Sequence, residues 1–376
     1  MIYFDNAATT KPSKNAIEKA MQFNETSYFN PSALYQEGIN ASNTLNMVRQ
    51  NILKYLGLSS SEYKVVFTSC GSESDNLAIF GNVKRGVFVT DKGEHSAVFK
   101  SFNEHLARGN SVVFIDVNND GSVNVTELLE YIKNNKVDFV SIVHVNNETG
   151  AINDVNYISS QIKKINPKII FHCDGVQAFG KIPFKMNNSI DFYAISAHKI
   201  NGLKGVGALI CKKSLNLNPI IYGGGQEGGV RSGTENVFGI KVLDYAMQEH
   251  FENLLDNFNQ VKSLNIYVQE NINKDVFTII SNENCSPYIL SISAKGLKGE
   301  VLMHSLEIDG FIVGNGSACS SRNKYSRVLQ SCGYKNEILE GVIRISFSHE
   351  NTIEEVKSLV NYLNIEGEKL KRIMLK

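Results

Sequence analysis

The sequence predicts an α/β fold whose large domain is built on a mostly parallel, seven-stranded sheet, joined to a smaller α+β domain. Seven apolar runs of strand length occur in the first two thirds of the chain, and helix-length segments separate them. Most of the runs are apolar throughout rather than alternating, which is typical of strands covered on both faces. The seven runs are Lys64–Thr68, Gly86–Thr90, Ser111–Val117, Phe139–Val145, Ile169–Asp174, Phe192–Ser196 and Val206–Cys211.

The segments between these runs carry helical patterns. Val125–Asn134 and Asn156–Ile165 have the length and the mixed polar and apolar composition of surface helices, and Ser74–Phe80 is predicted as a further helix. Strands that alternate with helices are typical of parallel sheets.

The last third of the chain has a different pattern. A long helical stretch, Asn236–Asn273, precedes four short apolar runs and a final amphipathic helix from Thr352 to about Lys371. The four runs are Val276–Ile280, Ile289–Ser293, Gly310–Val313 and Val342–Phe347. We therefore assign residues 12–250 to the large domain, and residues 1–11 and 251–376 to the small α+β domain.

The composition excludes several classes of protein. Of 376 residues, 42% are hydrophobic and 20% are charged, which is enough apolar material for a folded core and excludes natural disorder. Lys+Arg and Asp+Glu both number 38, so no overall positive field attracts nucleic acid or an acidic membrane. The N-terminus lacks a signal-like apolar stretch, and no run reaches membrane-spanning length. We expect a soluble, cytoplasmic protein that needs neither a membrane nor direct contact with nucleic acid.

Two polar residues at the ends of neighbouring strands suggest a cofactor site. Lys199 follows the strand ending at Ser196, and Asp174 ends the preceding strand. Alone, Lys199 is better explained as an exposed lysine and Asp174 as a helix N-cap. Together they suit pyridoxal phosphate, because a lysine binds its aldehyde and a carboxylate keeps its ring nitrogen protonated. Both are expected in one crevice at the carboxyl edge of the sheet.

A turn after the first predicted strand suits a phosphate group. Gly71 and Ser72 stand where a strand gives way to a helix, and free N–H groups at a helix N-terminus favour an anion. Ordinary helix capping explains these residues equally well when they are taken alone. The turn is not a nucleotide-binding P-loop, since no G-x-x-x-x-G-K-[ST] motif occurs in the chain.

The cysteines point to one candidate nucleophile. None of the six cysteines forms a C-x-x-C pair, which argues against a zinc site or a dithiol, and we expect no metal. Cys319 lies in a small, polar segment, Gly314–Lys324, with Arg327 close behind it, whereas Cys173 and Cys211 belong to apolar strands. A thiolate on such a segment is suited to nucleophilic attack and sulfur transfer.

Motifs along the whole chain resemble those of the cysteine desulfurases, in the class V branch of the fold-type I pyridoxal phosphate enzymes. They keep the order that they have in that family. The matching segments are Asp5–Thr10, Thr68–Asn76, Glu94–His95, His144–Gly150, Asp174–Gln177, Ser196–Lys199, Gly223–Gly225, Arg231–Thr234, Gly316–Cys319 and Arg344.

The resemblance implies a role for each matching position. Lys199 would bind the cofactor covalently, Asp174 would face its ring nitrogen, and His95 would stack on the ring and act as acid or base. Asn147 and Gln177 would bind its phenolic oxygen. Its phosphate would be held by Gly71, Ser72, Ser196 and His198, and by Thr234 of a second subunit, which implies a homodimer. Arg344, for which the sequence shows no other partner, would clamp the substrate carboxylate; Asn147 would also contact the substrate.

These roles imply the conversion of L-cysteine to L-alanine, with a persulfide formed on Cys319. The rivals are a selenocysteine lyase, another class V aminotransferase, and a non-catalytic sulfur-relay or nucleotide-binding module. The expected sulfur acceptor is a tRNA-thiolating enzyme, a thiamin-pathway protein or an iron–sulfur scaffold. The segment after Cys319 is about one residue shorter than in scaffold-serving relatives, and the chain ends soon after its last helix; the early end favours the first two acceptors.

Overall fold

The large sheet of the computed structural model has the seven predicted strands. Their order is β2-β8-β7-β6-β5-β3-β4, and only β8 runs antiparallel to its neighbours. The strands are β2 (Tyr63–Thr68), β3 (Val87–Asp91), β4 (Ser111–Ile115), β5 (Phe139–Val143), β6 (Ile170–Asp174), β7 (Phe192–Ser196) and β8 (Gly207–Lys212). The prediction of a mostly parallel, seven-stranded sheet is therefore confirmed. The structure describes residues 1–315 and 325–374.

Helices cover both faces of this sheet, as the apolar strands require. One face packs Phe88, Phe139 and Leu209 against α3 (Gly71–Gly81) and α4 (Ser96–Ala107). The other face packs Val89, Val140 and their neighbours against four helices. These are α2 (Gln36–Leu56), α5 (Val125–Asn134), α6 (Val155–Ile165) and α7 (Val237–Glu252), and α1 (Lys14–Thr26) packs on α7. Short 3-10 turns follow at η1 (Ala197–Lys199) and η2 (Glu227–Gly229).

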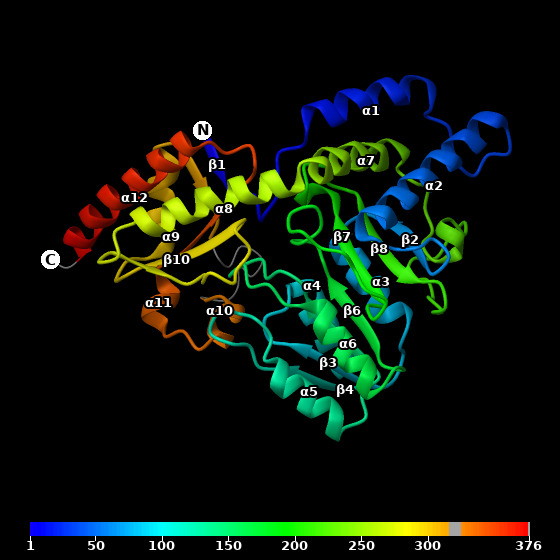
Figure 1. The fold of residues 1–376 in the computed structure, drawn as a ribbon, viewed down its shortest axis with the longest axis horizontal. Helices are drawn as coiled ribbons and strands as arrows, with labels where there is room; N and C mark the ends of the chain where they lie inside the picture. Colours follow the sequence, from blue (N-terminus) through cyan, green and yellow to red (C-terminus); the bar gives the residue numbers. More distant parts are fainter. Residues whose placement is uncertain (316–324, 375–376) are drawn as a thin grey trace.

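The remaining elements form a second layered unit, at the left of Figure 1. Its antiparallel sheet has the order β12-β10-β9, and a separate parallel pair joins β1, at the start of the chain, to β11. The strands are β1 (Ile2–Phe4), β9 (Phe277–Ile279), β10 (Ile289–Ala294), β11 (Phe311–Val313) and β12 (Val342–Ser346). The helices are α8 (Leu254–Asn271), α9 (Gly299–Ile308), α10 (Arg327–Ser331), α11 (Asn336–Glu340) and α12 (Ile353–Met374).

The smaller unit has its own apolar core, which contains Phe4 from the first strand and Leu359 from the last helix. The α+β prediction is thus confirmed, whereas the exact boundary at residue 250 stays a prediction. The long helical stretch predicted over 236–273 is two helices that meet at Asn253. Among the described residues, no helix is both long enough and apolar enough to cross a membrane.

Candidate active site

The carboxyl edge of the large sheet brings the predicted residues together. β6 and β7 run parallel, so Asp174 and Ser196 end neighbouring strands at the same edge, and η1 carries Lys199 directly after. β2 also ends there, at Thr68, and leads into the N-terminus of α3. A cavity of about 430 Å³ opens at this edge. Its walls include Gly71, Ser72, His95, Asn147, Asp174, Gln177, Ser196, His198, Lys199 and Arg344.

Lys199 points its amine at the turn that follows β1. Its Nζ donates hydrogen bonds to the carbonyl oxygens of Ala7 and Ala8, at 2.6 and 2.8 Å. The residue is half-buried, so an exposed surface lysine does not describe it. Two carbonyls from the beginning of the chain therefore orient an amine that belongs to the middle of the sheet.

Asp174 is a buried acid with 4% of its surface exposed. Its Oδ1 accepts the backbone N–H of Val176 at 2.9 Å. Burial raises the pKa of Asp174, while His95, this backbone hydrogen bond and Lys199 act in the opposite direction. The helix N-cap explanation fails, because residues 175–180 form turns rather than a helix.

His95 caps the N-terminus of α4 and also lines the cavity. Its Nδ1 accepts the backbone N–H of Ala97 at 3.2 Å. Burial is the main cause that lowers the pKa of His95, so the neutral imidazole is favoured. A neutral ring that accepts at Nδ1 carries its proton on Nε2, which makes His95 a proton donor through that atom.

The predicted phosphate end of the cavity has features, among the described residues, that suit an anion. Helix α3 begins at Gly71, and its N-cap residue, Cys70, makes no side-chain capping hydrogen bond. The buried Oγ of Ser196 has no hydrogen-bond partner in the described chain. His198 pairs through Nδ1 with the Thr9 hydroxyl at 3.1 Å, and burial is the main cause that lowers its pKa to about 4.

Two of the predicted site residues, Thr234 and Cys319, are not among the described residues that line the cavity. Thr234 is exposed and is not among the lining residues, which is compatible with a residue expected to serve a second subunit. Its loop is tied to α3 by an ion pair between Arg231 and Glu73 at 2.8 Å. Cys319 lies outside the described residues. No group of His, Cys, Asp or Glu side chains suited to a metal ion occurs within the described part of the chain.

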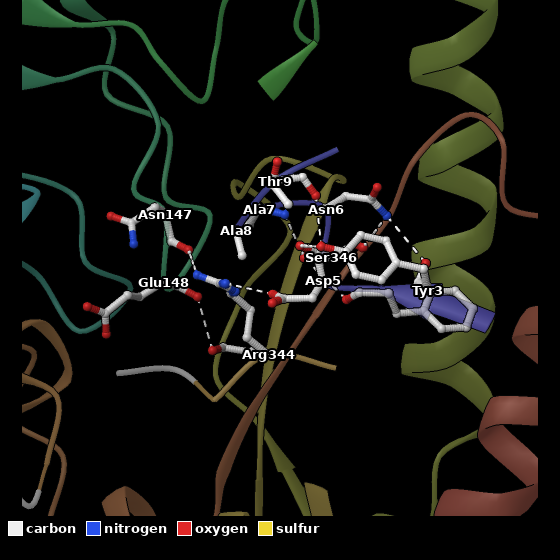
Figure 2. A network of polar contacts seen from close by, with 12 residues as sticks. Tyr3, Asp5, Asn6, Ala7, Ala8, Thr9, Asn147, Glu148, Arg344 and Ser346 are labelled. Carbon is white, nitrogen blue, oxygen red and sulfur yellow. Dashed lines mark hydrogen bonds and ion pairs between the residues drawn. The ribbon is translucent and has the colours of Figure 1, made fainter. Parts of the chain in front are cut away.

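Arg344 has a partner that the sequence did not reveal, so that expectation was wrong. Its Nη2 forms an ion pair with Asp5 at 2.8 Å, and its Nη1 donates to the carbonyl of Asn147 at 2.7 Å. Figure 2 shows the guanidinium held between these two groups. Its buried Nε has no hydrogen-bond partner among the described residues, so the Nε–H is available to a ligand. Asp5 and Arg344 are 339 positions apart, which is why no local pattern pairs them.

Sequence reasoning assigned no role to several groups that the fold places here. The carbonyls of Ala7 and Ala8 have no side-chain signal at all. Asp75 and Glu94 are buried cavity residues, and burial is the main cause that raises the pKa of both well above the usual value. Burial therefore disfavours the charged form of both carboxyl groups. The sequence did contain a signal for both residues, because Asp75 lies in the matching segment Thr68–Asn76 and Glu94 in the segment Glu94–His95.

These features fit pyridoxal phosphate. The N-terminus of the eleven-residue helix α3, which has no side-chain cap, suits a phosphate, and so does the Ser196 hydroxyl, which has no partner among the described residues. Asp174 is a buried acid for the ring nitrogen, and Lys199 supplies the amine. The cavity volume is in the range of small-molecule sites. We therefore assign Lys199, Asp174, Ser196 and the start of α3 as the groups that would hold the cofactor.

Comparison with known proteins agrees with this description of the fold. Residues 2–359 match the model of the aminotransferase class-V family. The chain is 32% identical to a cysteine desulfurase IscS of Dictyoglomus turgidum, over 99% of this chain and 96% of that protein. A solved NifS-like protein superimposes with a TM-score of 0.88 at 32% identity, covering 97% of this chain and 98% of the other. A structure described as SspA in complex with cysteine gives a TM-score of 0.80 at 28% identity, over 94% and 100% of the two chains.

The chain therefore belongs to the aminotransferase class-V family. Within that family its relatives are cysteine desulfurases, which depend on pyridoxal 5′-phosphate.

Proposed function

We propose that this protein is a pyridoxal phosphate-dependent cysteine desulfurase in which Cys319 takes the sulfur of L-cysteine. The substrate Cβ–S bond breaks, a bond forms between that sulfur and Cys319 Sγ, and Cβ gains a hydrogen, so that L-alanine and a persulfide result. The observation that carries the proposal is the convergence of Lys199, Asp174 and His95 on one cavity that has an uncapped helix N-terminus.

The cofactor supplies an electron sink that lowers the cost of negative charge at the substrate α-carbon. The residues of the chain provide the remaining functions. Asp174, the buried acid at the end of β6, would face the ring nitrogen. Lys199, steered by the carbonyls of Ala7 and Ala8, moves the proton at the α-carbon. His95 donates its Nε2 proton toward the sulfur side of the substrate, because its Nδ1 is occupied by the N–H of Ala97.

Arg344 is the proposed binding group for the substrate carboxylate. Its guanidinium is almost completely buried on the cavity wall, where an ionic hydrogen bond is strong. Within the described part of the chain the Nε–H has no partner, whereas Asp5 and the Asn147 carbonyl hold the other two nitrogens in place. A carboxylate is thus met by a pre-oriented, planar donor rather than by a flexible side chain.

The residues on either side of the Cys319 segment support the role of its thiol. Gly314 pairs through its backbone with Arg344 in both directions, at 2.8 and 2.9 Å. Arg327 donates to the carbonyls of Lys92 and Glu94, and its guanidinium carbon lies 3.8 Å from the centre of the Phe99 ring. Arg327 and Arg344 line the cavity and Gly314 pairs with Arg344, so the chain before residue 316 and the chain after residue 324 are both anchored beside the cavity.

A homodimer is part of the proposal. Thr234 is exposed on a loop that the Arg231–Glu73 ion pair ties to α3, so it is available to a second subunit. Large apolar side chains are exposed near the start of α2 and on the Thr234 loop: Tyr28 is 67%, Leu34 is 95% and Tyr222 is 82% exposed. Burying such side chains between two copies is favourable, at roughly 25 cal/mol per Å² of apolar surface.

We also place the enzyme in the cytoplasm.

The direct test is incubation of the cofactor-loaded protein with L-cysteine, with alanine and protein-bound persulfide measured by mass spectrometry. We expect equal amounts of alanine and persulfide in a single turnover, with the persulfide on Cys319. Cys319→Ser should form none, whereas Cys285→Ser, which changes a thiol outside the cavity, should behave as wild type. Transfer of the amino group to an oxo acid, or reaction with selenocysteine alone, would instead establish one of the rival enzymes.

The sulfur acceptor is tested separately. Labelled sulfur on Cys319 is offered in parallel to a tRNA-thiolating enzyme, a thiamin-pathway sulfur carrier and an iron–sulfur scaffold. The sequence-based expectation is faster transfer to one of the first two. A faster reaction with the scaffold would show that this expectation is wrong while leaving the desulfurase proposal intact.

A further inference from the structure

Lys181 is a buried lysine beside the active site for which the mechanism above has no use. Only 3% of its surface is exposed, and no carboxylate forms an ion pair with it within the described part of the chain. Its Nζ donates to Oε1 of Gln177 at 3.0 Å and lies 5.9 Å from the centre of the Tyr288 ring. Burial of an amine without a counter-charge is costly, so its presence needs a reason.

The charges around Lys181 increase this cost. Burial is the main cause that lowers its pKa, to about 7, and the positive charges of Lys199 and Arg344 add to the effect. Lys181 therefore lies behind the cavity wall, within electrostatic reach of two cations that line the cavity. Buried, perturbed groups beside a cavity are typical of functional sites.

The contact between Lys181 and Gln177 determines which way the Gln177 amide faces. A backbone carbonyl only accepts hydrogen bonds, so the side of the Gln177 amide that faces the carbonyl of Ala7 is its NH₂ group. Oε1 of Gln177 therefore faces Lys181, and Nε2 faces the carbonyl of Ala7, to which it donates at 2.8 Å. A flipped amide would place its NH₂ group against the Lys181 amine and its oxygen against the oxygen of Ala7. One Nε2–H of Gln177, a residue of the cavity wall, is left for a ligand.

We propose that Lys181 is a positioning residue that fixes the Gln177 amide so that its remaining N–H points at the phenolic oxygen of the cofactor. The inference rests on the proposed function in one respect, that Gln177 contacts the bound pyridoxal phosphate. Lys181 acts through Gln177 and does not touch the cofactor. A donated N–H stabilises the negative form of that oxygen, and the cation behind the amide strengthens the donor.

A purely structural role for Lys181 has different consequences. The side chain packs its methylenes in the interior and places its amine near the Tyr288 ring, so its removal can lower stability with no effect on Gln177. The two roles are distinguished by whether the effects of changing Lys181 disappear once the Gln177 amide is absent.

The experiment compares Lys181→Met, Lys181→Gln, Gln177→Leu and the double variant Lys181→Met/Gln177→Leu. The first readout is the dissociation constant for pyridoxal phosphate, from titration of the apoprotein. The second is the pH midpoint of the absorption change of the bound cofactor. Lys181→Met should bind the cofactor about tenfold more weakly and shift that midpoint upward by about one unit, because the phenolic oxygen loses its donor.

The double variant should bind no more weakly than Gln177→Leu, and Lys181→Gln, which keeps an N–H donor, should stay within about threefold of wild type. Independent, multiplying losses in the double variant would overturn the proposal, as would a wild-type midpoint in Lys181→Met. Should Lys181→Met fail to fold, a tenfold loss in folded Lys181→Gln would overturn it equally. Absence of pyridoxal phosphate binding by the wild type would instead refute the proposed function.

Discussion

Replacement of Gly71 by alanine tests whether the start of α3 holds the cofactor. A Cβ at Gly71 would lie 2.6 Å from Cγ2 of Val176, about 1 Å closer than two carbon atoms approach in contact. Valine is stiff at χ1, so the clash moves the backbone of Val176, whose N–H donates to Asp174. At an open helix position alanine would be preferred to glycine, so any loss comes from this contact.

Overpacking of this kind costs about 1–3 kcal/mol, which corresponds to a loss of roughly 5- to 150-fold in an equilibrium constant. We expect the loss in cofactor affinity, because both the phosphate turn and the Asp174 hydrogen bond are displaced. Titration of apoprotein with pyridoxal phosphate measures it, and thermal unfolding of the apoprotein shows whether the fold is kept.

The compensating change is Val176→Ala, which removes the clashing methyl group. The double variant Gly71→Ala/Val176→Ala should recover affinity to within about threefold of Val176→Ala alone. Wild-type affinity in Gly71→Ala would refute the reasoning, and so would a double variant that binds as weakly as Gly71→Ala.

Three further predictions follow from the same geometry. Lys199→Ala should fold, yet lose both the absorption band of the lysine-bound cofactor and alanine formation; continued alanine production would exclude Lys199 as the reacting amine. Arg344→Lys should raise KM for L-cysteine about 10- to 100-fold, with a smaller change in cofactor affinity, because an ammonium lacks the planar fork; an unchanged KM would place the carboxylate elsewhere. Burial lowers the pKa of His144 to about 3, below its unfolded value near 6.5, so stability is lost as pH falls from 6.5. Between pH 6 and pH 5, urea unfolding should show that wild type loses about 1.2 kcal/mol more than His144→Gln, and equal losses would contradict this.

The sequence by itself determined the large sheet and the residues at its edge. Buried parallel strands are apolar on both faces, so each run was visible locally, and the polar residues that end β6 and β7 stood out against it. The fold class fixes where such strand ends meet, which is why Asp174 and Lys199 could be placed in one crevice from their positions in the chain alone.

Tertiary structure alone decided which groups hold these residues in place. β1 pairs with β11, and the turn after β1 lies beside the cavity. There the carbonyls of Ala7 and Ala8 accept hydrogen bonds from Lys199, and Asp5 forms an ion pair with Arg344. A backbone carbonyl has no side chain to read, and an ion pair across 339 positions leaves no local pattern. The direction of the Gln177 amide likewise depends on two neighbours, Lys181 and Ala7, that only folding makes adjacent to its two ends.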